Sequence, residues 1–216
     1  RVNGESKEFQ EEASPWLMKL LLDDGAVEVV FAKEDVILIR LTKCTLSLER
    51  NNQDLVIQSV ARTPKGGFRM IAQDSILELT PIKGTIQDNA PMELARMWDS
   101  WHFAHPQVHF HLVPHPENEI GLFALTEYQC ESSERLYEYD FEECVQNVRQ
   151  EYLDWCGTQV PVISKYREAA LRAHYVNWSS VVAPRGHYTD YAMLMGKNWM
   201  DRVWNWDNYF KSMATS

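Results

Sequence analysis

The sequence has too little positive charge and too few apolar runs for two large classes of protein. Lysine and arginine together number 21, against 31 aspartates and glutamates, which gives a formal net charge of −10. Because phosphate binding needs clustered basic side chains, this balance argues against nucleic acid or an anionic membrane surface as a partner. The sequence also contains no run of eighteen apolar residues. We therefore expect no membrane-spanning helix.

Cysteine is scarce, and its spacing fits neither a zinc site nor a disulfide framework. The four cysteines are Cys44, Cys130, Cys144 and Cys156. We expect reduced, partly buried thiols and no cofactor. A signal peptide with a basic start and an apolar centre is also missing, which predicts a cytoplasmic protein. A leader already removed ahead of Arg1 would instead indicate secretion.

The apolar residues are frequent enough for a sizeable core, at 45% of the chain. They form short β-branched or aromatic runs separated by turn residues, which predicts an antiparallel β-sandwich within residues 1–128. The expected strands are Val27–Phe31, Val36–Leu41, Thr45–Leu48, Leu55–Ser59, Phe68–Ile71, Ile76–Leu79, Thr85–Gln87, Gln107–Val113 and Glu119–Thr126. Ahead of them, a frayed segment to Glu12 and a short helical turn from Ser14 through Leu22 are expected, since Ser-Pro can cap and start a helix.

Four histidines, His105, His109, His111 and His115, lie on or next to one expected strand. His109 and His111 must share a face because side chains alternate along a strand. A zinc or copper site is geometrically possible there. The favoured alternative is an edge strand whose histidines are hydrogen-bonded to neighbours, since no Cys, Asp or Glu within the strand completes a ligand set. We predict no metal site.

The remainder of the chain is predicted to be helical, so the fold class is mixed β and α. Apolar residues spaced three and four apart predict a helix that ends at Gly157, with an acidic, solvated start that suits the positive end of the helix dipole. They are Phe141, Cys144, Val145, Val148, Tyr152 and Trp155. A second helix is expected over Ser164–Ser180. Its predicted packing stripe is Tyr166, Ala169, Ala170, Ala173, Val176 and Asn177.

The stretch from Met195 to Phe210 has the composition of a carbohydrate site. Indole rings stack on the apolar faces of sugars, while carboxylate, arginine and amide groups bind the hydroxyls. The stretch supplies both kinds of group: Lys197, Trp199, Arg202, Trp204, Asn205, Trp206, Asp207 and Tyr209. Composition alone also fits core packing, since tryptophan and phenylalanine mostly serve burial.

The order of these residues favours a carbohydrate site over core packing. Arg202-Val-Trp-Asn-Trp-Asp207-Asn-Tyr-Phe210 resembles a motif of the (α/α)6-barrel glycosidases of glycoside hydrolase family 63 and their trehalase-like relatives. Residues 175–187 and 192–200 are similar to the bacterial members described as glycogen-debranching or mannosylglycerate-hydrolase-type. The close resemblance covers roughly the last quarter of the chain. Before that, only the layout is similar, with a β-rich domain ahead of the barrel.

The resemblance implies an inverting, exo-acting glycosidase for α-glucosides or α-mannosides of oligosaccharides. Asp207 matches the general acid, and a glutamate base about 6.5–9.5 Å away is expected beyond Ser216. Residues 1–216 would then be the inactive N-terminal part of a larger enzyme, with a linker helix in 129–160 and the start of the barrel in 161–216. The implied substrate contacts are Trp206, Trp204, Arg202, Asn205, Trp199, Lys197 and Tyr209. The loop Arg185–Trp199 would line the barrel mouth and bring Tyr188 near the substrate.

Other interpretations of these residues, and other functions of the chain, stay open. Lys197 could instead cap a carbonyl, and Arg202 could pair with a barrel carboxylate. Asp99, between Trp98 and Trp101, copies the later Trp-Asp pair but precedes strands, so we expect it to cap a turn or to line the edge of the sandwich. The chain could be a carbohydrate-binding sandwich that uses Trp98 and Trp101. It could also be a structural domain in which the stripe on the second helix binds protein.

Overall fold

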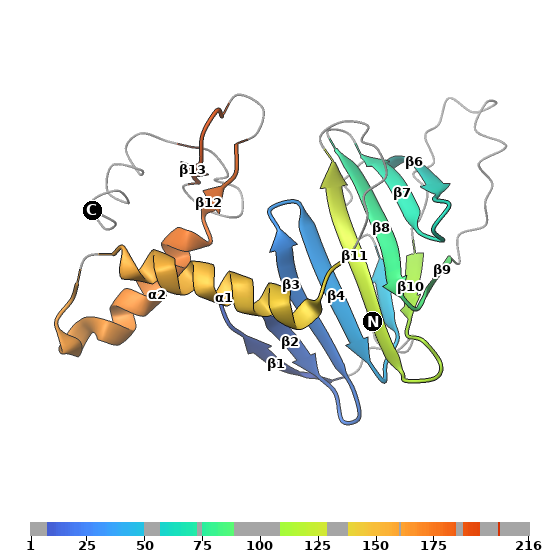
Figure 1. Cartoon of the computed structure of the whole chain (residues 1–216), viewed down its shortest axis with the longest axis horizontal. Helices are drawn as coiled ribbons and strands as arrows, with labels where there is room; N and C mark the ends of the chain where they lie inside the picture. The colour runs from blue at the N-terminus through green and yellow to red at the C-terminus, as the bar shows by residue number, and fades with distance from the viewer. Residues whose placement is uncertain are drawn as a thin grey trace. The chain divides into compact units, whose positions relative to one another are not determined.

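The computed structural model describes residues 8–49, 57–72, 75–88, 109–128, 138–159, 161–184 and 188–194, and residue 203. Among them are a large antiparallel β-sheet and two α-helices, so the mixed β and α class is confirmed (Figure 1). The chain divides into two compact units, Arg1–Val145 and Gln146–Ser216, and each is described by itself.

The described strands of the first unit form two antiparallel sheets. The described strands are β1 Gln10–Ala13, β2 Met18–Leu21, β3 Ala26–Lys33, β4 Val36–Thr42, β5 Leu46–Glu49, β6 Ile57–Arg62, β7 Phe68–Ala72, β8 Ile76–Lys83, β9 Thr85–Asp88, β10 His109–Val113 and β11 Ile120–Tyr128. Eight of these form a sheet in the order β1-β2-β3-β4-β11-β8-β7-β6, and three form a smaller sheet in the order β5-β10-β9. The last strand in sequence, β11, therefore lies in the middle of the larger sheet.

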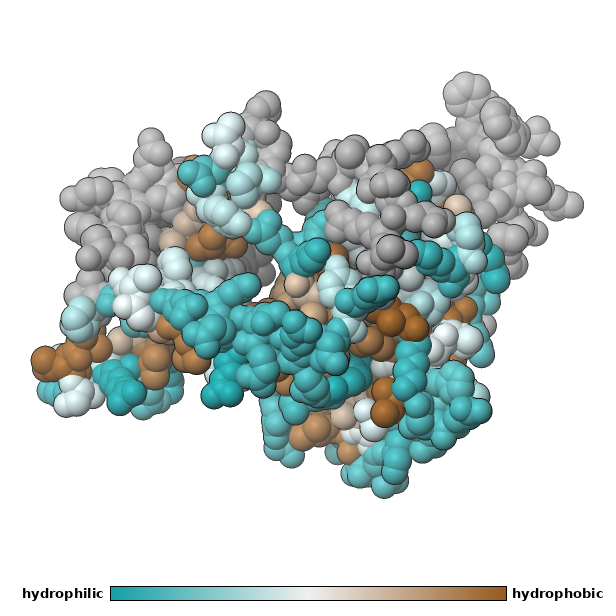
Figure 2. Space-filling model, in the orientation of Figure 1, coloured by the Kyte–Doolittle hydropathy of each residue, from teal (hydrophilic) through white to brown (hydrophobic). Residues whose placement is uncertain are grey.

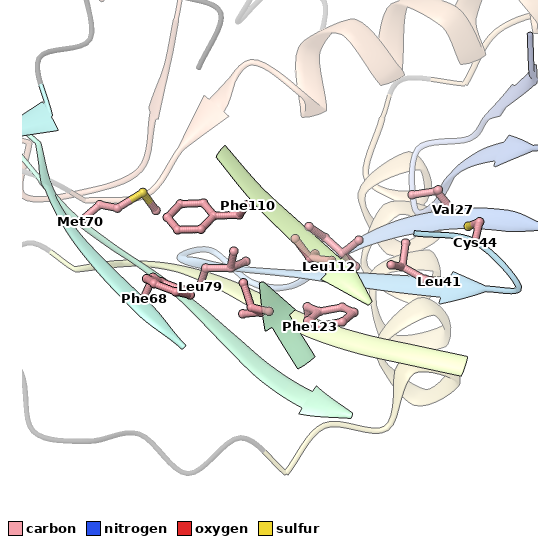
Figure 3. Close-up of a cluster of buried hydrophobic side chains, with 11 residues drawn as sticks. Val27, Leu41, Cys44, Phe68, Met70, Leu79, Phe110, Leu112 and Phe123 are labelled. Carbon is pink, nitrogen blue, oxygen red and sulfur yellow. The ribbon is translucent and has the colours of Figure 1, made fainter. Parts of the chain in front are cut away.

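The two sheets share one hydrophobic core, which is what the predicted sandwich requires. Phe123 of the larger sheet and Leu112 of the smaller one are both fully buried in it. Figure 3 shows these side chains gathered between strands of the two sheets. Alternation along β4 explains the arrangement, because Ile39 and Leu41 belong to this core while Arg40, between them, points to the outer face.

Short connections that contain residues with positive φ carry the chain from one sheet to the other. Gly84 alone joins β8 to β9, with a φ of 108°. A Cβ atom at Gly84 would lie 2.4 Å from the carbonyl oxygen of Val113, so only glycine fits. Lys43, between β4 and β5, and Glu119, between β10 and β11, also have positive φ. The Lys43 N–H donates to the carbonyl of Glu119 at 2.8 Å, which ties two of these connections together.

Helix α1, Phe141–Gly157, begins in the first unit and continues into the second. Asp140 caps it, since its carboxylate accepts a hydrogen bond of 2.9 Å from the Glu143 N–H. The second unit continues with the 3-10 turn η2, Ser164–Tyr166, helix α2, Arg167–Trp178, and the short strands β12, Val181–Val182, and β13, Ala192–Met193. The described part of this unit contains no closed ring of helices, and the barrel stays a proposal.

The prediction for the N-terminus was wrong. Residues 10–21 form the hairpin β1–β2 in place of a frayed end and a helical turn. Ser14 closes the turn, because its N–H donates to the Leu17 carbonyl at 2.9 Å and its hydroxyl accepts from the Leu17 N–H at 3.0 Å. Ser-Pro suits the start of a turn as well as a helix cap, and the packing of Leu20 against the core decides between them.

The predicted edge position of the histidine strand was also wrong. β10 is the central strand of the smaller sheet, where His111 lies between Ser47 of β5 and Gln87 of β9. The pairing partners are distant in sequence, so the local pattern could not reveal them. His109 and His111 share a face as expected, opposite the buried Phe110 and Leu112.

The predicted packing stripe of the second helix is mostly exposed. Tyr166, Ala169, Ala173 and Val176 are exposed, and Asn177 is buried. The helix instead turns Trp178 toward α1, where its ring meets that of Tyr152 edge to face, with centroids 5.4 Å apart. Figure 2 shows further hydrophobic residues over the connection from α1 to α2, where Val162 and Ile163 are exposed.

Candidate functional site

The predicted sugar-binding residues lie outside the described residues. These are Lys197, Trp199, Arg202, Trp204, Asn205, Trp206, Asp207 and Tyr209, and only Val203 of that stretch is described. The same holds for Trp98, Asp99, Trp101 and His105. Their roles therefore stay predictions.

The structure does describe the residues that come just before the Trp-Asp motif in the sequence. β12 and β13 pair antiparallel, and the Leu194 N–H donates to the Ser180 carbonyl at 2.8 Å. Ser180 is buried just past the end of α2, and its hydroxyl donates to the Val176 carbonyl at 2.7 Å. The chain thus enters residues 195–210 from a ribbon fixed to the end of α2.

The predicted loop Arg185–Trp199 is interrupted by this ribbon, since Ala192–Met193 is a strand. Tyr188 and Tyr191, on the connection between β12 and β13, are exposed. The Asp190 carboxylate accepts a hydrogen bond of 2.7 Å from the Tyr191 N–H, which fixes the local backbone. The role of Tyr188 near a substrate stays a prediction.

Helices α1 and α2, which precede the ribbon in the sequence, contact each other. Besides the ring contact with Trp178, the Tyr152 hydroxyl donates to the Leu171 carbonyl at 3.3 Å. Burial raises the pKa of Tyr152 to about 12, with a further contribution from its hydrogen bond to the Cys156 side chain. The phenol therefore stays a hydrogen-bond donor at neutral pH and holds the two helices together.

The helix pair also holds three buried polar atoms that have no hydrogen-bond partner among the described residues. They are Trp155 Nε1, Gln159 Oε1 and His174 Nδ1. The amide nitrogen of Gln159 is occupied, because it donates to the Trp155 carbonyl at 3.1 Å and to Thr158 Oγ1 at 3.1 Å. Sequence analysis named Trp155 as an apolar position of the first helix, and it did not single out Gln159 or His174.

A second group that sequence analysis missed lies on the outer face of the larger sheet. We call Lys19, Glu28, Arg40, Phe141 and Glu142 the Arg40 cluster. Glu28 Oε2 accepts from Arg40 Nε at 2.7 Å, and Glu28 Oε1 lies 3.1 Å from Lys19 Nζ. Arg40 also donates to Glu142 Oε1 at 2.5 Å, and its guanidinium carbon lies 4.0 Å from the centre of the Phe141 ring.

The charges of this cluster are well matched. Burial by itself would lower the pKa of Arg40, but its hydrogen bonds to Glu142 and Glu28 outweigh burial and raise it. Glu78, on β8, is held in the same way, since Arg69 Nε and one terminal nitrogen donate to its Oε2 at 2.9 and 2.7 Å. Thr80 donates to Glu78 Oε1 at 3.1 Å. Carboxylates occupied in this way stabilise the sheet and do not resemble a catalytic pair.

The histidines offer no metal centre within the described part of the chain. His111 Nδ1 lies 2.7 Å from the Ser47 hydroxyl, and the Glu117 N–H donates to His115 Nδ1 at 3.4 Å. No group of three or more His, Cys, Asp or Glu side chains among the described residues is placed to hold a metal ion. The described cysteines, Cys44, Cys144 and Cys156, are free thiols. Among the same residues no helix is both long and apolar enough to cross a membrane.

The fold has a counterpart among solved structures. No protein-family model matches the chain, and no curated protein matches it. A structure of the GH92 family glycosyl hydrolase CcMan5 is similar over 88% of this chain, with a TM-score of 0.54 and 9% sequence identity. The similar region is 33% of that protein, so the chain spans about a third of its length. At this identity the similarity shows a shared fold, and the narrower resemblance to family 63 rests on the motif residues alone.

Proposed function

We propose that the chain is part of a glycoside hydrolase and carries its general acid, Asp207. The observation that carries the proposal is the order along the chain. A sandwich whose fold is shared with a glycosyl hydrolase is followed by a helix pair and a ribbon, and the ribbon leads directly into the Trp-Asp motif. Residues 1–128 would be the sandwich domain, 129–160 the linker helix and 161–216 the start of the (α/α)6 barrel.

The proposed reaction is hydrolysis of an α-glucoside or α-mannoside with inversion. Asp207 protonates the departing glycosidic oxygen, and a glutamate outside residues 1–216 activates water on the opposite face of the sugar. Burial among Trp204, Trp206 and Tyr209 would favour the protonated form of Asp207, because burial disfavours a charged carboxylate. The indole rings would stack on the sugar, while Arg202, Asn205 and Lys197 bind its hydroxyls. Trp199 would complete the apolar wall.

The test uses the full-length protein, assayed on α-glucosides and α-mannosides. We expect Asp207→Asn to lower kcat by about 10²–10⁴, the usual contribution of a general acid. Asp99→Asn is the matched control, because Asp99 also follows a tryptophan but is not assigned to the site. Equal activity of wild type and Asp207→Asn would overturn the proposal. Glycan binding without turnover, retained when residues 161–216 are deleted, would point to a carbohydrate-binding sandwich instead.

A further inference from the structure

Residues 177–179, Asn-Trp-Ser, form an acceptor sequence for N-linked glycosylation, which is Asn-X-Ser or Asn-X-Thr with X other than proline. The 216 residues contain no second triplet of this kind. In glycoproteins the acceptor lies on the surface, because the attached oligosaccharide is bulky and hydrophilic. Asn177 is buried in this protein, so the triplet and the fold make opposite demands on the same residue.

The burial of Asn177 comes from its place at the packed end of α2. Asn177 lies in the last turn of this helix, and 8% of its surface is exposed. The next residue, Trp178, packs its ring edge to face against Tyr152 of α1, with the centroids 5.4 Å apart. An oligosaccharide on Asn177 Nδ2 would displace the groups that cover this side chain, and a close-packed interior gives way only at a cost in stability. The folded chain therefore has no room for the glycan.

The third residue of the triplet, Ser179, is also held in the folded chain. Its backbone is helical, with φ −71° and ψ −7°, and its N–H donates to the Tyr175 carbonyl at 2.9 Å. Its hydroxyl donates to the Val176 carbonyl at 3.1 Å. The following residue, Ser180, is buried, and its carbonyl accepts from the Leu194 N–H beside the β12–β13 ribbon. An enzyme that must bind both the amide and the hydroxyl of the triplet finds the amide buried and the hydroxyl bonded to the backbone.

We propose that Asn177 is a glycosylation acceptor in the unfolded chain alone, and that a glycan there keeps α2 from packing on α1. The transfer joins Asn177 Nδ2 to the anomeric carbon of an oligosaccharide, breaks the bond between that carbon and the pyrophosphate of a lipid carrier, and releases one amide proton. Folding and glycosylation of this chain then exclude each other. The chain therefore folds where the transferase is absent, which argues against the endoplasmic reticulum and agrees with the cytoplasm. This inference does not depend on the glycosidase function proposed above.

The first experiment supplies an oligosaccharyltransferase and its lipid-linked oligosaccharide to two acceptors, a synthetic peptide of residues 172–184 and the folded full-length protein. The peptide stands for the unfolded chain, since a helix this short is marginal in water. We expect the peptide to gain the mass of the oligosaccharide and residues 172–184 of the folded protein to gain none. The peptide with Asn177→Gln is the control. A folded protein modified at Asn177 as far as the peptide, or a peptide that is not modified, would overturn the proposal.

The second experiment directs the full-length protein into the endoplasmic reticulum of host cells with an added signal peptide. Ser179→Ala is the matched variant, because it removes the acceptor sequence and leaves Asn177 in place. We expect mass spectrometry to find a glycan on Asn177 of the wild-type chain and none on Asn177 of Ser179→Ala. The glycosylated wild type should be recovered in the aggregated fraction and Ser179→Ala in the soluble fraction. Soluble wild type with a glycan on Asn177 and unchanged hydrogen exchange of the α2 amides would contradict the proposal.

A second acceptor shows whether the position of the glycan matters. Asn118 is exposed in the turn between β10 and β11, and its side-chain oxygen accepts from the Ile120 N–H at 3.2 Å. Ile120→Thr in the Ser179→Ala chain completes an Asn-X-Thr triplet there and keeps a β-branched residue at the start of β11. We expect this chain to carry its glycan and stay soluble. Aggregation to the same extent as the wild type would mean that the burial of Asn177 is not the cause.

Discussion

Phe68 on β7 and Phe110 on β10 lie with their ring centroids 4.7 Å apart and their planes at 41°. The two residues belong to different sheets, so this contact joins the halves of the sandwich across its core. Tilted aromatic pairs at this distance add attraction beyond the area that they bury.

Phe110→Ala should therefore destabilise the chain by about 3–5 kcal/mol, since it removes a buried ring and leaves a cavity between the sheets. Urea denaturation gives the measurement, as a lower midpoint at an unchanged m-value. Phe31→Ala is the control, because Phe31 is 57% exposed at the end of β3, against 4% for Phe110. A similar loss in both variants would mean that the rings do not join the sheets.

Gly84→Ala should be more harmful than Gly66→Ala. Both glycines have positive φ, 108° at Gly84 and 77° at Gly66, so alanine is strained at each. Only at Gly84 would the new methyl group collide with backbone, at 2.4 Å from the Val113 oxygen, whereas nothing lies within 4 Å of it at Gly66. We expect about 1 kcal/mol at Gly66 and at least twice that at Gly84, measured by thermal unfolding.

The stability of the chain should fall between pH 10 and pH 12 through Tyr152. Burial and the hydrogen bond to Cys156 raise its pKa from 10.0 to about 12. The folded state then holds the phenol proton more tightly than the unfolded chain does, so the contribution is complete below pH 10 and is lost as the pH rises toward 12. Tyr152→Phe should lose less stability over that window than wild type in urea titrations. Tyr188→Phe, at an exposed tyrosine, should follow wild type; if it follows Tyr152→Phe, Tyr152 has no special part in the loss.

Removal of the cap of α1 should weaken the helix start. Asp140→Ala loses the carboxylate that accepts from the Glu143 N–H, and we expect a cost of about 0.5–2 kcal/mol. Asp140→Asn, which keeps a side-chain acceptor at the cap, should restore most of this stability. Denaturation of all three proteins under identical conditions checks the order, and an asparagine variant as weak as the alanine variant would contradict it.

Most strands of the sandwich after β2 were readable from sequence, because short apolar runs are separated by turn residues and some of them alternate with polar residues. Ile39, Arg40 and Leu41 show this alternation. Helix α1 was readable too, from its apolar spacing and from Gly157 at its end. The linear order of these elements needs only local patterns.

The predictions from sequence were wrong where a local pattern fits two structures, or where the structure depends on partners far away in sequence. Ser14-Pro15 satisfies the rules for a helix start and for a turn, and tertiary packing of Leu20 decided the matter. The central position of β10 depends on partners far away in sequence. The Arg40 cluster was unpredictable for the same reason, since Arg40 and Glu142 are 102 residues apart. For the candidate site, composition and the motif named the residues, and their arrangement remains a prediction.

The place of β11 in the larger sheet has a consequence for biosynthesis. β11 is the last strand of the sandwich to leave the ribosome, yet it hydrogen-bonds to β4 on one side and to β8 on the other. Until Ile120–Tyr128 has emerged, the larger sheet lacks its connecting strand, and β4 and β8 each have an unpaired edge. Unpaired edges with apolar faces are prone to aggregation. The larger sheet can therefore be completed only after Tyr128 has been synthesised, and a nascent chain that stops before Tyr128 exposes both of these edges.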